Sequence, residues 1–223
     1  MQHTLDVLIE AVPFLVGGVG TTLVIVIGGM LLGLVLGVPL AVGQVYGNAI
    51  ARRAAGLYVW FFRGVPILVL LFLFYYGLFH LIGLNLGAVA AAILVLGMTS
   101  AAYQSQIFRG AILSLSQGQF RAASALGMSN AQAIATIILP QALRLSLPGW
   151  SNEYSIMLKD SALVFVLGAT EIMARTHFVA SREYQHMPLY ITAALLYFLL
   201  TWAGVRSLRA FERRVAIRGY GRT

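Results

Sequence analysis

The chain has 223 residues, of which 60% are hydrophobic and 10% are charged, and it carries a formal net charge of +8 at pH 7. Soluble domains carry about a quarter charged residues. The composition therefore excludes a water-soluble globule and indicates a protein with several membrane spans. Cysteine is absent, which excludes disulfides, thiol chemistry and a cysteine zinc site, and the histidines lack metal-ligand spacing.

The N-terminal segment predicts one long span over 11–43. It contains Asp6 and Glu10 but no basic residue, so it lacks the charged start of a secretory signal, and we expect no cleavage. No charge occurs from 11 to 51, a length that also admits two hairpinned spans. Gly29, Gly33 and Gly37 recur every four residues, which predicts a smooth helix face for close packing.

Four further apolar runs complete a prediction of five spans. They cover 57–79, 87–108, 143–158 and 187–205, and the second contains Phe62-Arg63-Gly64-Val65-Pro66. Five spans place the two termini on opposite sides of the membrane. A six-span alternative divides the first run and places both termini inside.

The basic residues predict the orientation, since loops rich in Arg and Lys stay in the cytoplasm. Six of the fifteen lie in a basic tail over 206–223. With this tail inside and the N-terminus outside, twelve basic residues are cytoplasmic, Arg63 among them, and Lys159, Arg175 and Arg182 are external. Because the tail follows a span directly, the positive charge indicates membrane topology and not nucleic-acid binding.

A polar loop over 116–140 separates the third and fourth spans. Its small residues predict a short amphipathic helix, which Gly127 ends and after which Ser129 or Asn130 caps the next helix. We expect Pro140 to break the chain before the fourth span. The loop is too polar to cross the membrane, so it lies on the cytoplasmic side.

Several ordered motifs resemble one family. The polar loop resembles the E-A-A, G and I-x-L-P pattern of ATP-binding-cassette (ABC) importer permeases. The matching residues are Gln119-Phe120-Arg121-Ala122-Ala123, Gly127 and Ile137-Ile138-Leu139-Pro140. Five further segments are similar to motifs of the polar amino acid branch of this family, the His/Gln/Arg/Glu-type permeases. They are Phe62–Pro66, Ser100–Tyr103, Ile107–Ala111, Asn152-Glu153 and Leu158–Val164. The resemblance implies an all-α transmembrane fold, the five-helix type I importer permease with a cytoplasmic coupling helix.

The resemblance implies that the coupling helix docks into the ATPase. The residues it assigns to this contact are Gln119, Arg121, Ala122, Ala123, Leu126 and Gly127. Arg121 stands where the family has Glu, and Gln106 replaces a family Glu in the third span. Both departures favour a heterodimer with a second permease over a homodimer.

The resemblance also implies the partners. The chain has no Gly-x-x-x-x-Gly-Lys phosphate loop, so we expect two separate ATPase subunits to bind ATP and Mg²⁺. We expect no cofactor and no catalytic residue in this chain. A solute-binding protein would deliver the polar amino acid. The expected location is the bacterial inner membrane, with membrane lipid around the spans.

Charged residues within spans are candidate binding groups, because they are costly there. Glu153 lies about 18 Å along a helix that starts near Gln141, close to the membrane midplane. Asp160 follows seven residues later on nearly the same face. We predict that these carboxylates bind a substrate ammonium group, with Lys159, Ser161 or Asn152 near its carboxylate. Alternatively, Lys159 pairs locally with Asp160, and Glu153 bonds a neighbouring helix.

The sequence thus predicts a permease subunit of an ABC importer for a polar amino acid or a close derivative. The first alternative is a secondary transporter or channel, which would need a coupling-ion site and usually an inverted repeat. The second is an intramembrane enzyme, which would need a catalytic constellation within the spans. The sequence presents neither set of features.

Overall fold

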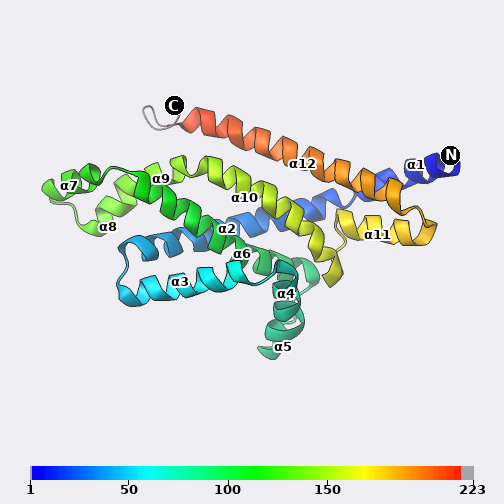
Figure 1. Ribbon diagram of the computed structural model, residues 1–223, viewed down its shortest axis with the longest axis horizontal. Coiled ribbons are helices and arrows are strands. Elements are labelled where there is room, and N and C mark those ends of the chain that lie inside the picture. The colour runs from blue at the N-terminus through cyan, green and yellow to red at the C-terminus, as the bar shows by residue number, and fades with distance from the viewer. Residues whose placement is uncertain (1, 217–223) are drawn as a thin grey trace.

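The computed structural model describes residues 2–216, without the side chains of Gln2, His3 and Leu5. The described residues are almost entirely helical and include no strand, so the predicted all-α fold is confirmed. Figure 1 shows an elongated molecule in which the long helices run roughly along one axis. The first helix and the C-terminal part of the last helix lie toward opposite ends of this axis.

The N-terminal segment forms two helices, α1 (Gln2–Val16) and α2 (Val19–Tyr46). Together they contain a 41-residue apolar stretch, Asp6–Tyr46, which extends past the predicted 11–43 at both ends. The short break at Gly17-Gly18 is where α11 approaches. A Cβ atom on Gly18 would lie 2.7 Å from the backbone nitrogen of Ile172. Only glycine therefore allows this approach without a shift.

The predicted glycine stripe does pack closely, against α6 (Ala88–Ser114) and α10 (Leu147–Asp160). A Cβ atom on Gly33 would overlap Nε2 of Gln104, and one on Gly37 would lie 3.2 Å from the carbonyl oxygen of Ala101. One on Gly29 would lie 3.2 Å from the Met157 side chain. Small residues thus hold α2 and α6 in close contact along their length.

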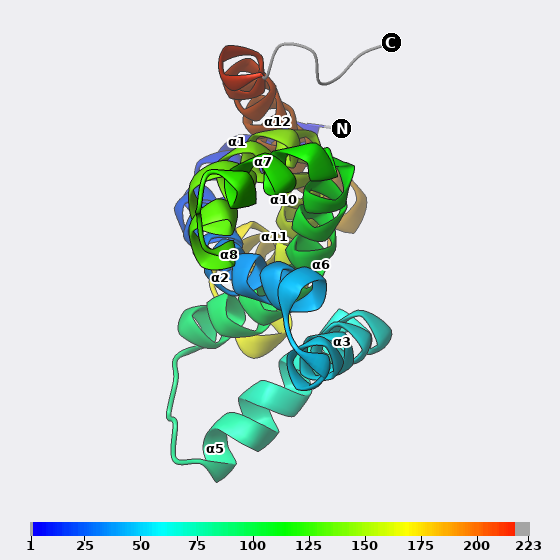
Figure 2. The same ribbon diagram turned by 90° about the vertical axis from the view of Figure 1, so that its left-hand side faces the viewer.

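The segment predicted as a span over 57–79 is not one straight helix, because the chain bends there by 106°. The segments on either side are α3 (Ala49–Gly64), then α4 (Ile67–Phe72), the π-helix η1 (Leu73–Leu78) and α5 (Phe79–Leu81). Pro66 disfavours helical geometry at the preceding residue, and Val65 is extended with φ −95° and ψ 132°. In Figure 2, α5 points away from the packed helices.

The polar loop and the following span form a run of short helices. They are α7 (Gln117–Ala125), α8 (Asn130–Ala133), the π-helix η2 (Ile134–Ile138), α9 (Leu139–Leu145) and α10. Gly127 follows α7 with φ +78°, and Ser129 caps α8 in a capping box, as predicted. The break expected at Pro140 is wrong. The wider π turn just before Pro140 lets the chain remain helical despite the missing N–H.

The C-terminal part comprises a 3₁₀-helix η3 (Ser161–Leu167), α11 (Ile172–Glu183) and α12 (His186–Val215). The predicted tail over 206–223 is therefore helical up to Val215. Arg218 and Arg222, two of its six arginines, lie outside the described residues.

Glu171 joins three elements at the start of α11. Its carboxylate is fully buried and accepts hydrogen bonds from the backbone nitrogens of Met173 (2.9 Å) and Ala174 (2.7 Å). It also accepts a short hydrogen bond from the Tyr197 hydroxyl on α12. The next residue, Ile172, donates its backbone N–H to Oγ1 of Thr22 on α2, at 3.3 Å. The Glu171 carboxylate thus fixes the start of α11 against α12, and the Ile172 N–H fixes it against α2.

Among the described residues, three helical stretches are long and apolar enough to cross a membrane: Asp6–Tyr46, Ala88–Ser114 and His186–Val215. The bent segment 49–81 would be a fourth if it counts as one broken span. The helix α10 alone has 14 residues, fewer than the roughly 20 that a full crossing needs, but α9 continues it. The count of five spans stays a prediction.

Candidate functional site

A cavity of about 390 Å³ lies where the bend between α3 and α4 faces α6 and α10. Its walls combine apolar side chains with six polar or charged ones. They are Arg63 at the end of α3, Thr99, Ser100 and Tyr103 on α6, and Glu153 and Asp160 on α10. The residues of the 106° bend, Gly64 to Pro66, themselves form part of the wall beside Arg63.

Two predicted binding residues, Glu153 and Asp160, line this cavity together. The helix α10 continues through Asp160, so the seven-residue spacing keeps both carboxylates on one face. Glu153 is 4% exposed, and its Oε1 accepts a hydrogen bond of 2.7 Å from the Ser100 hydroxyl on α6. The alternative in which Glu153 bonds a neighbouring helix is thus realised, and its binding of substrate stays a prediction. One carboxylate oxygen makes this bond while the residue still faces the cavity.

Arg63 is a site residue that the sequence reasoning missed. Its guanidinium lies 5.0 Å from the centre of the Tyr103 ring, in a cation–π contact at the wall of the cavity. The prediction that Arg63 is cytoplasmic while the end of α10 is external is wrong, since Arg63 and Asp160 line one small cavity. Arg63 lies about 16 Å further along α3 than Arg52, so the two arginines need not lie at the same depth.

A buried polar network supports Ser100 from behind. Gln104 is fully buried, and its Nε2 donates to Oγ of Ser100 (3.0 Å) and to the carbonyl oxygen of Met30 (3.0 Å). Its Oε1 accepts a hydrogen bond of 2.7 Å from the Trp150 indole nitrogen. Because the network spans α2, α6 and α10, it fixes the hydroxyl that holds Glu153. The available signal was a glutamine four residues after Ser100 within an apolar span.

The other three predicted binding residues lie elsewhere. Lys159 is exposed outside the cavity, and Ser161 is buried with its hydroxyl bonded to the carbonyl oxygen of Leu158 at 2.7 Å. Asn152 lines a different groove, between α10 and α12. The considered Lys159–Asp160 ion pair is not formed, since the ion pair found within residues 2–216 joins Arg182 to Glu183. Helix periodicity explains these positions, because adjacent residues point to different faces.

The predicted coupling residues divide between two sides of α7. Arg121, Ala122 and Leu126 are exposed, with Leu126 82% exposed. Ala123 is 1% exposed, and Gln119 exchanges two side-chain hydrogen bonds with Gln141 on α9, of 3.0 and 2.7 Å. Ala123 and Gln119 therefore face the rest of this chain and do not lie on the exposed side of α7. The helix also starts and ends two residues earlier than predicted, so Leu126 and Gly127 follow its last turn.

Comparisons with known proteins agree with the motifs. The chain is 39% identical over 192 residues to a probable amino-acid ABC transporter permease of Bacillus subtilis, covering 86% of this chain and 84% of that protein. It is 35% identical over 211 residues to the histidine/lysine/arginine/ornithine transport system permease HisM of Salmonella typhimurium, covering 88% of each. The predicted resemblance to amino acid ABC permeases is therefore confirmed.

Solved structures show the same fold. A chain of an amino acid ABC transporter crystallised with histidines superposes with a TM-score of 0.82 at 32% identity, covering 93% of this chain and 96% of that one. A chain of the inward-facing MetNI methionine ABC transporter gives 0.80 at 23% identity, over 92% and 97%. The family model for binding-protein-dependent transport system inner membrane components matches residues 29–217. The chain belongs to this family of ABC transporter permeases.

Proposed function

We propose that this chain is the permease subunit of an ABC importer that carries a polar amino acid or a close derivative. The observation that carries the proposal is the cavity at the bend, which collects two carboxylates from α10 and one guanidinium from the end of α3. Charged groups in spans mark substrate paths by default, because their burial is costly.

The charges of the cavity suit a zwitterion. The carboxylates of Glu153 and Asp160 are acceptors for an ammonium group, and the guanidinium of Arg63 can hold a carboxylate through two parallel hydrogen bonds. A volume of about 390 Å³ falls in the range of about 300–1,000 Å³ that ligand pockets occupy. Arg63 takes the role that the sequence analysis gave to Lys159, Ser161 or Asn152.

The names of the relatives support this class of substrate. HisM belongs to a histidine/lysine/arginine/ornithine system, and OccQ of Rhizobium meliloti, 35% identical over 214 residues, belongs to an octopine system. The solved relative was crystallised with histidines. Each of these substrates carries an α-amino acid group, which is the part that the two carboxylates and Arg63 are placed to bind.

In this proposal, transport is driven from outside the chain. Two ATPase subunits bind ATP and Mg²⁺ and contact the exposed side of α7, where Arg121 and Leu126 lie. A second permease chain completes the pathway, and a solute-binding protein delivers the amino acid at the side of the external N-terminus. The complex resides in the bacterial inner membrane.

The binding test uses the complete transporter in liposomes, with uptake and ligand-stimulated ATPase as readouts. Removing one partner of a charged hydrogen bond costs about 1.5–3 kcal/mol, so Glu153→Gln should raise the KM for uptake roughly 10- to 100-fold. The matched control is Glu183→Gln, whose carboxylate lies on the surface beside Arg182. If both variants transport normally in a folded complex, the cavity is not the substrate site.

The coupling test places a charge on the exposed side of α7. Leu126→Asp should reduce recovery of the ATPase with the tagged chain, because Leu126 is 82% exposed at the end of α7, whereas Ile50→Asp, at a similarly exposed apolar residue on α3, should leave it unchanged. Equal recovery in both variants would contradict docking at α7. If the chain purified alone and moved solute without ATP, the secondary-transporter alternative would replace this proposal.

A further inference from the structure

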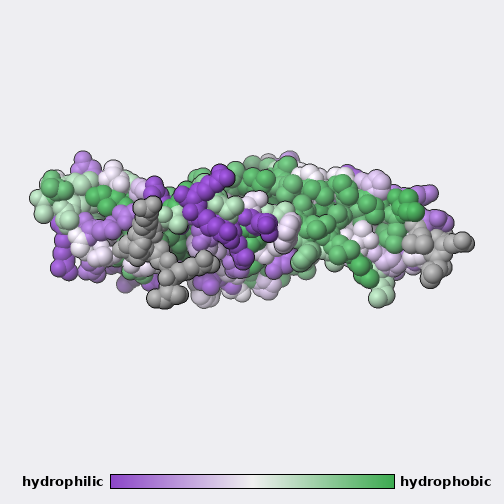
Figure 3. Space-filling model, turned by 90° about the horizontal axis from the view of Figure 1, so that it is seen from above, coloured by the Kyte–Doolittle hydropathy of each residue, from purple (hydrophilic) through white to green (hydrophobic). Residues whose placement is uncertain are grey.

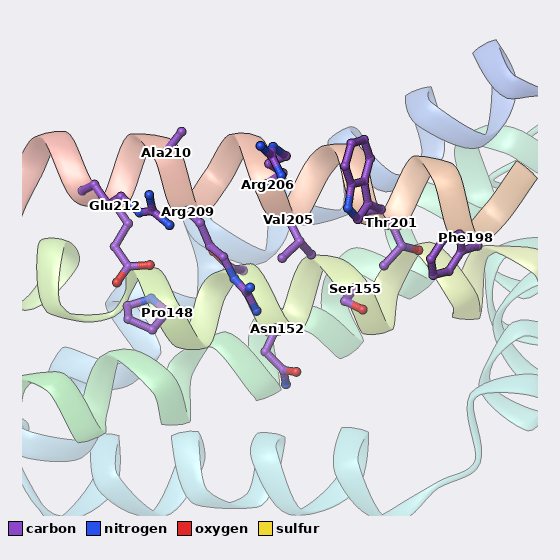
Figure 4. Close-up of a pocket in the computed structure, with 13 residues that line it drawn as sticks. Pro148, Asn152, Ser155, Phe198, Thr201, Val205, Arg206, Arg209, Ala210 and Glu212 are labelled. Atoms are coloured by element: carbon purple, nitrogen blue, oxygen red, sulfur yellow. The ribbon is translucent and has the colours of Figure 1, made fainter. Parts of the chain in front are cut away.

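A groove of about 730 Å³ runs between α10 and the C-terminal part of α12, separate from the cavity at the bend. One wall is basic and the other is polar. The basic wall is formed by Arg206, Arg209 and Arg213 on α12, and the polar wall by Ser151, Asn152 and Ser155 on α10. Figure 4 shows Arg209 extending from α12 toward Asn152.

The groove is electropositive. The three arginines recur at positions i, i+3 and i+7, which places them on one helix face. The acidic lining residue is Glu212, which extends toward Pro148 at one end of the groove in Figure 4. The lining therefore carries three positive charges and one negative charge. It favours an anion, and guanidinium groups match the geometry of phosphate oxygens.

Ser151 gives an independent indication of a ligand. Its side chain is 4% exposed, lines the groove, and its Oγ makes no hydrogen bond in the described part of the chain. By comparison, two other helical hydroxyls bond their own helix: Ser161 donates to Leu158, and Thr201 donates to Tyr197. A buried hydroxyl without a partner is costly, so a polar atom in the groove would satisfy it.

The depth of the groove matches the headgroup region of a membrane. Twenty helical residues cross the hydrocarbon core of about 30 Å, and Arg206 lies twenty residues after His186, the first residue of α12. In Figure 1 this end of α12 lies toward the same end of the molecule as α7. The arginines thus begin where α12 leaves the hydrocarbon on the side of the coupling helix.

Apolar side chains continue the groove toward the membrane interior. Phe198 and Trp202 line it on the N-terminal side of the arginines, and both are more than half exposed. Figure 3 shows hydrophilic residues along the C-terminal part of α12, next to a hydrophobic surface further along the molecule. A free phosphate ion would use only the basic part. A phospholipid would use both parts, with its headgroup at the arginines and its chains along the aromatic rings.

We propose that this groove binds the headgroup of an anionic phospholipid from the leaflet on the side of the coupling helix. Arg209 and its neighbouring arginines hold the phosphate, and the Ser151 hydroxyl donates a hydrogen bond to a headgroup oxygen. The bound lipid fills the space between α10 and α12. This site is independent of the amino acid cavity, so the two proposals can fail separately.

The test uses the complete transporter, stripped of lipid and returned to bilayers of phosphatidylcholine with a minority of phosphatidylglycerol. Native mass spectrometry then counts the phosphatidylglycerol retained per complex. One Arg near a charged membrane surface contributes about 1 kcal/mol, so Arg209→Gln should weaken retention about five-fold. The matched control Arg144→Gln changes an exposed arginine on α9 outside the groove and should have no effect.

Three results would overturn the proposal. Equal retention in Arg209→Gln and Arg144→Gln would show that the groove has no lipid specificity. Displacement of phosphatidylglycerol by excess inorganic phosphate would indicate a site for a free anion. Because the chain has no cysteine, Asn152→Cys introduces a single thiol, and its cross-linking to another permease chain would show that protein covers the groove. Should Arg209→Gln fold poorly, Ser151→Ala provides a smaller change with the same expected direction.

Discussion

Replacing Glu171 by alanine should loosen the start of α11 more than any surface substitution on that helix. The carboxylate caps α11 through the backbone nitrogens of Met173 and Ala174, and it accepts the Tyr197 hydroxyl. Alanine removes all three acceptor contacts at once. The first turn of α11 would then hold its place through packing and the bond from Ile172 to Thr22.

The expected cost follows from these contacts. Loss of a helix cap costs about 1 kcal/mol. The Tyr197 hydroxyl would be left without its acceptor, and side-chain hydrogen bonds between membrane helices average about 0.6 kcal/mol, with a maximum near 1.7. The sum is about 2 kcal/mol. Since 1.4 kcal/mol corresponds to a factor of ten, local opening should become roughly 30-fold more frequent.

Amide hydrogen exchange of the complete transporter measures this opening directly at Met173 and Ala174. Tyr197→Phe should increase exchange less, because the two backbone contacts of Glu171 stay in place. Glu183→Ala, at the other end of α11, serves as the control and should leave these amides unchanged. If Glu171→Ala and Glu183→Ala exchange equally, the carboxylate does not hold α11 in place.

Three further predictions concern packing and capping, and each is measured as a change in the free energy of unfolding. Gly33→Ala should cost about 1–3 kcal/mol because its Cβ meets Gln104, whereas Gly43→Ala, with open space at its Cβ, should stabilise by about 0.5–1 kcal/mol. Ser129→Ala removes a capping box and should cost about 1 kcal/mol. Trp150→Phe leaves Oε1 of Gln104 buried without its donor and should cost about 1–3 kcal/mol.

Opposite outcomes would count against the reasoning in each case. A stabilising Gly33→Ala would mean that α2 and α6 separate easily. A neutral Ser129→Ala would mean that packing alone sets the start of α8. A neutral Trp150→Phe would mean that water replaces the indole at Gln104.

Features that depend on local chemistry were predictable from the sequence. The turn at Gly127, the cap at Ser129 and the packing face at Gly33 each follow from one residue type at one position. Glu153 and Asp160 were predicted to share a helix face, and they do so because α10 is regular between them.

Features that depend on the path of the chain were not predictable in this way. Hydropathy treats 57–79 as one apolar run and carries no information about direction, so the bend at Pro66 and the entry of Arg63 into the site were missed. Counting Arg63 as cytoplasmic and Lys159 as external then separated Arg63 from the end of α10, although Arg63 and Asp160 line one cavity. The role of Gln104 requires three helices to be placed relative to one another, which periodicity within a single helix does not provide.

The bend between α3 and α4 also has a consequence for hydration. In a continuous helix, the carbonyl of Phe62 would accept the N–H of the residue four positions later, but that residue is Pro66, which has none. Irregular backbone at membrane depth is tolerated where it is enclosed by protein or faces water, because lipid offers no hydrogen bonds. Phe62 and Pro66 both line the cavity. We therefore expect this cavity to hold water when no solute is bound, so that an entering amino acid exchanges one polar environment for another without passing through hydrocarbon.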